Sequence, residues 1–176
     1  AEMMKLLAAP DPAPALAAMG ASGVLAPVLP GADPAVLARL VALEEDTATA
    51  PDAVRRLAAL AGPDAAEDLR LSRKVQARIA DLRGGVEGGA GAGELGYRLG
   101  AERARDVLLL RAAATASPLD PDALAEVRAG ANAVFPVRAA DLMPRFTGPD
   151  LGRELSRLEA RWIASGFALD KAALLS

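Results

Sequence analysis

Apolar residues recur every three or four positions along most of this chain, and proline or glycine separates one such stretch from the next. Leu37, Leu40 and Val41, for example, follow the pair Asp33-Pro34 and would form one face of a helix that begins there. No stretch alternates Val, Ile or Thr with polar residues as a half-buried strand would. The pattern therefore predicts an all-α fold, an irregular bundle of short packed helices.

The same pattern gives the approximate extent of each element. Residues 134–137 should be extended, because the residue before Pro136 avoids the helical region. We expect a short apolar turn over 24–29 and helices over 2–9, 12–19, 34–46, 51–61, 65–71, 73–83, 95–99, 101–114, 121–133, 139–143, 149–165 and 170–175.

One glycine-rich stretch interrupts the helical pattern. Residues 84–93 read Gly-Gly-Val-Glu-Gly-Gly-Ala-Gly-Ala-Gly, a composition typical of a flexible loop. We therefore expect helical parts over 1–83 and 94–176, joined at 84–93 and together forming one continuous all-α unit.

Composition limits the chemistry that the chain can perform. Apolar residues make up 52% and aromatic residues only 3% of the 176 residues, so the core should consist mainly of Ala, Leu and Val. The chain has neither His nor Cys, which excludes histidine general bases, thiolate nucleophiles and disulfides. We expect no catalytic residue, no metal site and no bound cofactor in this chain.

The chain also lacks the marks of a membrane or secreted protein. No apolar run approaches the roughly 20 residues of a membrane-spanning helix. Residues 1–5 are followed by no secretory signal pattern. We expect a cytoplasmic protein that does not interact with a membrane.

Charge is divided unevenly between the two ends of the chain. The formal net charge is −3. Residues 1–69 hold four basic and ten acidic residues, whereas residues 70–176 hold sixteen basic and thirteen acidic residues. This split suggests an anionic partner for the C-terminal part, although salt bridges on helix surfaces are the simpler explanation.

Three short motifs have ordinary explanations. The glycines within residues 91–96 match the dinucleotide-binding spacing, but no strand precedes them as that site requires. Asp120 and Asp122 could hold Mg²⁺, but they flank a helix start, where acidic residues complement the helix dipole. Residues 44–46, Glu-Glu-Asp, are expected to form a solvated helix end.

The longest predicted helix carries two stripes of side chains. Gly148 and Gly152 would let another backbone approach its start, and free N–H groups beside arginines suit phosphate groups. The stripes are an apolar one of Leu151, Leu155, Leu158 and Trp162, and a basic one of Arg153, Arg157 and Arg161.

The basic stripe has a second interpretation. Asp150 precedes Arg153 by three residues, and Glu154 precedes Arg157 by three, a spacing that forms ion pairs on a helix surface. In that case the glycines only shape the helix start. The pattern alone does not decide between the two interpretations.

The C-terminal third of the chain contains Phe135-Pro136-Val137, Ala140-Asp141-Leu142, Gly148 to Gly152, Leu158-Glu159, Trp162 and Phe167 to Leu175 in this order. This run resembles the tail of bacterial class II tRNA nucleotidyltransferases, the CCA-adding enzymes and poly(A) polymerases. Earlier blocks match the family in the same order: Lys5-Leu6-Leu7, Ser22 to Leu25, Leu69 to Ser72 and Tyr97 to Gly100.

The chain departs from the family pattern at Arg138, at Ala139 and over 144–147, and the glycine-rich stretch 84–93 is not a family feature. The family's catalytic head, whose glycine-rich turn and Asp-x-Asp pair hold Mg²⁺ and CTP or ATP, has no counterpart in this sequence. The resemblance implies that residues 1–83 are neck and body helices and residues 94–176 body and tail helices. It implies further that the chain needs an N-terminal catalytic head as its partner and is inactive alone.

By resemblance, the chain is the non-catalytic, RNA-binding region of a transferase of tRNA processing that adds CMP or AMP to RNA 3′ ends. It would position the tRNA acceptor arm and elbow through phosphate and sugar contacts, with little base readout. The candidate contacts are Arg138, Arg145, Gly148, Gly152, Arg153 and Arg157, followed in second rank by Arg73, Lys74, Arg98 and Arg103.

The alternative is a helical protein-interaction or scaffold module without an RNA role, which the negative net charge favours. The two functions differ in their response to salt, because RNA bound through phosphates is released as salt rises. On the RNA hypothesis, the substitutions Arg153→Ala and Arg157→Ala together should weaken tRNA binding.

Overall fold

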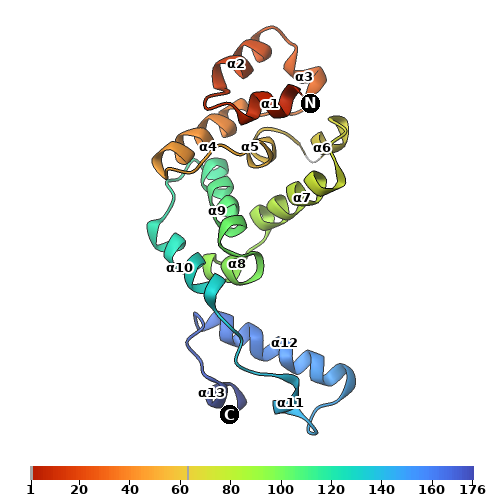
Figure 1. Cartoon of the computed structure of the whole chain (residues 1–176), viewed down its shortest axis with the longest axis vertical. Coiled ribbons are helices and arrows are strands. Elements are labelled where there is room, and N and C mark those ends of the chain that lie inside the picture. Colours follow the sequence, from red (N-terminus) through yellow and green to blue (C-terminus); the bar gives the residue numbers. More distant parts are fainter. Residues whose placement is uncertain (1, 63) are drawn as a thin grey trace. The chain divides into compact units, whose positions relative to one another are not determined.

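The computed structural model describes residues 2–62 and 64–176, and over these residues it contains thirteen helices and no strand. The prediction of an all-α fold of short packed helices is therefore confirmed. The helices are α1 (Glu2–Ala8), α2 (Ala13–Ala21), α3 (Leu25–Val28), α4 (Pro34–Asp46), α5 (Ala53–Leu60), α6 (Ala65–Asp68), α7 (Arg73–Glu87), α8 (Ala92–Leu99), α9 (Ala101–Thr115), α10 (Pro121–Asn132), α11 (Ala139–Leu142), α12 (Gly148–Ala164) and α13 (Lys171–Leu175) (Figure 1).

Aspartate side chains fix several of the helix starts. The carboxylate of Asp33 accepts the backbone N–H groups of Ala35 and Val36 at 2.9 and 3.3 Å at the start of α4. Asp52 accepts the N–H of Arg55 at 2.7 Å at the start of α5. First-turn N–H groups have no partner within the helix, so these carboxylates stabilise the two helix starts. The start of α4 lies where the sequence predicted it, whereas α5 begins two residues after the predicted start at 51.

The helices group into two compact units. Unit 1 comprises the residues up to Ala90 together with Glu102–Pro121, and unit 2 comprises Gly91–Ala101 and Asp122–Ser176. The chain thus passes between the units three times, whereas the sequence suggested a single junction at 84–93. The reason is α9, whose Leu109 and Ala113 are fully buried in unit 1.

The glycine-rich stretch is largely helical, so the loop predicted for 84–93 is wrong over most of its length. Helix α7 continues to Glu87 and α8 begins at Ala92. Only residues 88–91 lie between helices, and they begin with the C-cap Gly88.

Close packing explains why glycines stand at the end of α7. A Cβ atom on Gly85 would lie 2.6 Å from Cγ2 of Val107. Helix α9 can therefore approach the end of α7 this closely only because Gly85 has no side chain. Arg111 of α9 donates hydrogen bonds to the carbonyl oxygens of Gly85, Gly88 and Ala90 at 2.6, 2.6 and 2.8 Å. These bonds satisfy carbonyl groups that a helix end leaves without partners.

Helix α5 lies at the centre of unit 1, where it contacts α1, α4 and α7. The core around it is aliphatic, as the composition predicts. Its most buried members, each no more than 1% exposed, are Leu7, Leu16, Leu29, Leu37, Leu57 and Leu60.

A buried ion-pair cluster also occupies unit 1. Glu44 is 2% exposed and accepts hydrogen bonds from both Arg55 (2.6 Å) and Arg56 (2.7 Å). Arg55 also pairs with Asp106 at 2.6 Å, and Arg78 bridges Asp106 and Asp52 at 2.9 Å each. The expectation that residues 44–46 form a solvated helix end is therefore wrong for Glu44, because two arginines of α5 compensate its buried charge.

In unit 2, helices α11 and α13 both pack along α12 (Figure 1). The buried residues of this core are Val137, Leu142, Leu158, Trp162 and Leu174.

Helices α8 and α10 of unit 2 meet at glycines. A Cβ on Gly96 would lie 2.1 Å from the carbonyl oxygen of Val127, and a Cβ on Gly130 would lie 1.9 Å from that of Gly93. Of the glycines whose spacing matches a dinucleotide site, Gly96 therefore allows two helix backbones to touch, and Gly93 lies at the same contact through its carbonyl oxygen.

Among the described residues, no helix combines the length and the apolar character needed to cross a membrane.

Candidate nucleic-acid interface

Helix α12 supports the region that the sequence singled out. Leu158 and Trp162 are buried at 1% and 3% exposure, and Leu151 and Leu155 pack against the same core while partly exposed. The predicted apolar stripe is confirmed. These residues pack one face of α12 against the core of unit 2, so the opposite face is exposed to solvent.

Aromatic packing fixes the C-terminal half of α12. The ring centroid of Trp162 lies 5.4 Å from those of Tyr97 and Phe135 and 4.9 Å from that of Phe167. The Tyr97 hydroxyl donates a 2.8 Å hydrogen bond to Glu159. Burial, followed by this bond to a carboxylate, raises the pKa of Tyr97. Three aromatic rings thus surround the single tryptophan of the chain.

Two arginines of the predicted basic stripe form ion pairs within α12. Arg153 pairs with Asp150, and Arg157 pairs with Glu154 through bonds of 2.9 and 2.7 Å. The bond from Arg157 lowers the pKa of Glu154 and raises that of Arg157. The ion-pair interpretation of the sequence spacing therefore holds for both arginines in the free chain.

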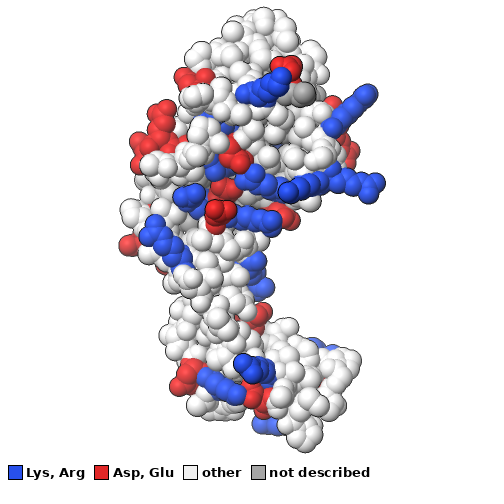
Figure 2. Space-filling model, viewed as in Figure 1, with Lys and Arg blue, Asp and Glu red and all other residues white. Residues whose placement is uncertain are grey.

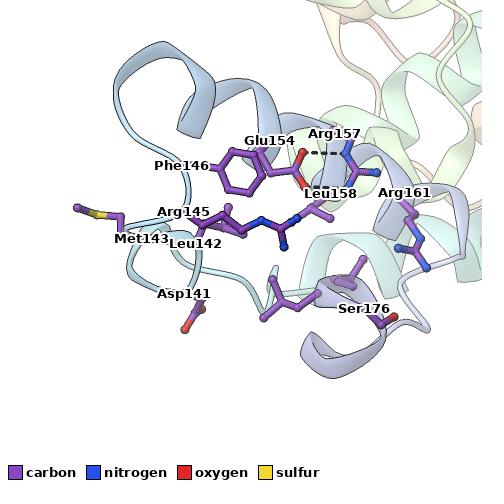
Figure 3. Close-up of a pocket in the computed structure, with 12 residues that line it drawn as sticks. Asp141, Leu142, Met143, Arg145, Phe146, Glu154, Arg157, Leu158, Arg161 and Ser176 are labelled. Carbon is purple, nitrogen blue, oxygen red and sulfur yellow. Dashed lines mark hydrogen bonds and ion pairs between the residues drawn. The ribbon is translucent and has the colours of Figure 1, made fainter.

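A cavity of about 380 Å³ opens beside α12 in unit 2 (Figure 3). We call it the arginine cavity. The buried Leu142, Leu158 and Leu174 line it together with charged residues of α12 and of the segment before it. Its other lining residues include Asp141, Met143, Arg145, Phe146, Glu154, Arg157, Arg161 and Leu175.

Two of the three arginines that line this cavity have no acidic partner. Within the described chain, neither Arg145 nor Arg161 forms a salt bridge, whereas Arg157 is paired with Glu154. The Arg145 guanidinium lies over the ring of Phe146, 5.4 Å from its centroid. In Figure 3, Arg145 extends from the segment before α12 and Arg161 from α12 itself, and both line the cavity.

The acidic residues at the cavity are compensated by other groups. Asp141 pairs with Lys171 and accepts the backbone N–H of Arg138 at 2.8 Å, and both interactions lower its pKa. The pKa of Glu154 is lowered by Arg157 and also by the charge of Arg145. Of the described side chains that line the arginine cavity, three are arginines and two are carboxylates, and Arg145 and Arg161 form no salt bridge.

The remaining first-rank candidates lie in unit 2 but do not line the cavity. Arg138 is exposed and caps the start of α11. Gly148 has a φ of +55°, a conformation that itself favours glycine. Gly152 is exposed, and no neighbouring atom lies within 4 Å of the place where a Cβ would stand, so its backbone is open to approach.

The second-rank candidates are divided between the units. Arg73 and Lys74 are exposed in the first turn of α7, and Arg103 of α9 lies 3.7 Å from Asp81, all in unit 1. Arg98 of unit 2 pairs with Glu94 at 2.7 Å. Figure 2 shows basic and acidic side chains interspersed over the face in view, as such pairing requires.

Arg161 is the one cavity arginine absent from the predicted contacts. A signal for it exists in the sequence. Arg153 and Arg157 each follow an acid by three residues, whereas Leu158 precedes Arg161 at that spacing. The absence of an i−3 acid distinguishes the arginine that stays unpaired.

No group of three or more acidic residues arranged to hold a metal ion occurs among the described residues. Comparisons with models of protein families, with curated proteins and with solved structures give no match.

Proposed function

We propose that this chain is the RNA-binding, non-catalytic part of a nucleotidyltransferase that adds CMP or AMP to RNA 3′ ends. Two arguments support the proposal. The first is the collinear resemblance of the sequence blocks, of which the tail block from Phe135 to Leu175 is the most specific. The second is that this block contains an arginine-lined cavity with a net surplus of positive charge.

The observation that carries the RNA role is that Arg145 and Arg161 line one cavity and that neither forms a salt bridge with another described residue. Guanidinium groups bind phosphate through paired hydrogen bonds and are always charged at neutral pH. A phosphate of the RNA backbone would therefore find two donors there. Arg153 and Arg157 already have carboxylate partners, so they would contribute less than the sequence suggested.

A titration of labelled tRNA with matched variants tests this role. Arg145→Ala combined with Arg161→Ala should weaken binding at low salt by about tenfold or more, because each lost contact is a charge-assisted hydrogen bond. Arg98→Ala combined with Arg153→Ala removes the same charge from ion pairs outside the cavity and should have the smaller effect. Equal effects of the two double variants would contradict the assignment to the cavity.

A helical protein-interaction module is the second candidate. The net charge of −3 and the ion pairing of Arg153 and Arg157 favour it. It predicts no binding of tRNA at low salt, so the same titration separates the two functions.

The proposed function assigns the chemistry to a separate catalytic head. Mg²⁺ and CTP or ATP would bind there, and this chain would add only affinity and orientation for the RNA. A cytoplasmic location follows from the same proposal, since tRNA is processed in that compartment.

A further inference from the structure

The arginine cavity has an apolar side that phosphate binding does not explain. Met143, Phe146 and Leu175 line it with side chains that are at least partly exposed, whereas Leu142, Leu158 and Leu174, at 6%, 1% and 2% exposure, offer a ligand little surface. A phosphate ion needs only donors and charge, and gains nothing from aliphatic walls. The cavity therefore fits a ligand with both an anionic and an apolar part.

Exposed apolar side chains gather at this cavity. Among the described residues, five large hydrophobic side chains are strongly exposed, and two of them, Met143 (55%) and Leu175 (39%), line the arginine cavity. Met is flexible and adapts its shape to a ligand. Apolar surface of this kind beside charged groups is typical of a binding site.

The pair Arg145 and Phe146 adds a flat surface to the same site. The guanidinium lies 5.4 Å from the ring centroid, with Phe146 half-buried beneath it and Arg145 exposed above it. An aromatic ring behind a guanidinium holds its plane in one orientation, which lowers the entropy lost when a ligand stacks on it. Arginine planes of this kind stack on unpaired bases in RNA complexes.

We propose that the arginine cavity binds one unpaired nucleotide of an RNA, with its base against the Arg145 guanidinium that lies over Phe146 and its phosphate at Arg161. This proposal deepens the proposed RNA role and rests on it. A volume of about 380 Å³ lies within the roughly 300–1,000 Å³ range of small-molecule sites, enough for a base and a phosphate together. The charges agree, because Arg157 is already neutralised by Glu154 and Arg161 is not.

A nucleotide site of this kind predicts a preference for single-stranded over duplex RNA, which phosphate contacts alone would not produce. A paired base is stacked inside its helix and cannot enter the cavity, so a single strand should bind better than a duplex of the same sequence. Phosphate contacts alone favour the duplex, whose charge density is higher.

The test compares a labelled ten-nucleotide single-stranded RNA with its duplex, using fluorescence anisotropy on the whole chain. Arg145→Lys keeps the positive charge but removes the planar group. It should weaken single-strand binding about tenfold, the scale of one lost stacking contact, and leave the salt dependence unchanged. Arg161→Ala should instead lower the salt slope by about 0.7, the share of one phosphate.

Arg128→Lys is the matched control, because Arg128 is exposed, does not line the cavity and is not among the predicted RNA contacts. It should bind like the unaltered chain, and circular dichroism melting should be the same for all variants. Competition with CMP and with inorganic phosphate completes the set, and CMP should displace the single strand at the lower concentration.

Three results would overturn the nucleotide site. The first is equal binding by the unaltered chain and Arg145→Lys, and the second is competition by inorganic phosphate as strong as that by CMP. The third is stronger competition by a phosphoserine peptide than by CMP, which would assign the cavity to a protein ligand. In each of the first two cases salt-dependent tRNA binding would leave the proposed RNA role intact, whereas loss of all RNA binding would remove both.

Discussion

Arg56 is the largest fully buried side chain of the described structure, at 1% exposure. Its guanidinium donates to Glu44 of α4 at 2.7 Å and to the carbonyl oxygens of Leu7 and Pro10 at 2.9 and 3.1 Å, at and beyond the end of α1. It therefore joins α1, α4 and α5 through groups that would otherwise be buried without partners. A buried charge of this kind is tolerated only when every partner is present.

Replacement of Arg56 by Met should destabilise unit 1 by about 3 kcal/mol or more, because it leaves part of the Glu44 charge and several carbonyls unpaired. Urea denaturation followed by circular dichroism measures the change. Arg153→Met, which breaks an exposed pair, is the control and should have little effect. A similar small effect of Arg56→Met would show that the cluster does not stabilise the unit.

Asp52 should make the stability of unit 1 depend on pH. Burial raises the pKa of Asp52, but the bonds from the Arg55 backbone and the Arg78 side chain outweigh it, so the folded pKa lies below 3.8. A group whose pKa is depressed by folding stabilises the protein above its unfolded pKa and loses that contribution as pH falls through the folded pKa. The free energy of unfolding should therefore decrease as pH falls below about 4.

Asp52→Asn keeps the oxygen that caps α5 and removes the charge, so its free energy of unfolding should change less between about pH 5 and about pH 3. Denaturant titrations of both proteins at these two pH values measure the difference. Identical pH dependence of the two proteins would contradict the role assigned to Asp52.

At the scale of residues, the sequence indicates local ion pairs but not distant ones. The three-residue spacing of Asp150 to Arg153 and of Glu154 to Arg157 made their ion pairs one of two open interpretations, and the structure contains both pairs. The burial of Glu44 is not readable in the same way, because its partners Arg55 and Arg56 lie in another helix. Only the packing of α4 on α5 brings them together.

Helix contacts through glycine are the main feature at the scale of elements. Gly96 and Gly130 let α8 and α10 approach until backbone atoms of one touch the other. Gly130→Ala would place a Cβ 1.9 Å from the carbonyl oxygen of Gly93. The helices would have to separate, and we expect a loss of about 1–3 kcal/mol.

Thermal melting of Gly130→Ala and Gly152→Ala tests this contact. Gly152 lies inside α12 with open space where a Cβ would stand, so its replacement by Ala should stabilise the helix by about 0.5–1 kcal/mol. The two melting temperatures should move in opposite directions. A rise for both would mean that α8 and α10 tolerate the added methyl group.

The start of α4 was predictable because the residue that fixes it, Asp33, is its neighbour in sequence. The structure of the stretch 84–93 was not predictable, because its glycines are required by packing against another helix. Gly85 is small because Val107 of α9 lies against it, and no local pattern records that contact. Composition indicated a flexible loop where the structure has a helix end held by Arg111.

At the scale of the molecule, each unit has its own core and its own charged surface. The core of unit 1 encloses the ion-pair cluster, and unit 2 carries the arginine cavity. The sequence indicated an unbalanced charge and a basic face on α12. The structure singles out Arg145 and Arg161 as candidate RNA contacts, because most of the other candidate residues form ion pairs or lie outside the arginine cavity.

If a separate catalytic head performs the transfer reaction and this chain binds the RNA, the chain alone should have no transferase activity. Incubation with tRNA, Mg²⁺ and labelled CTP or ATP should give no incorporation of label, because no residue pattern for binding the triphosphate is present in the sequence. A full-length nucleotidyltransferase serves as the positive control. Incorporation by the chain itself would mean that it is a complete enzyme and that the proposal is wrong.

The most direct test of the central claim is the salt dependence of tRNA binding. The logarithm of the association constant should fall linearly with the logarithm of salt concentration, and Arg145→Ala with Arg161→Ala should reduce the slope by about 0.9, the share of the one phosphate bound there. Arg98→Ala with Arg153→Ala should change the slope less. Binding that does not depend on salt, or no binding at low salt, would contradict the proposal that this chain holds RNA.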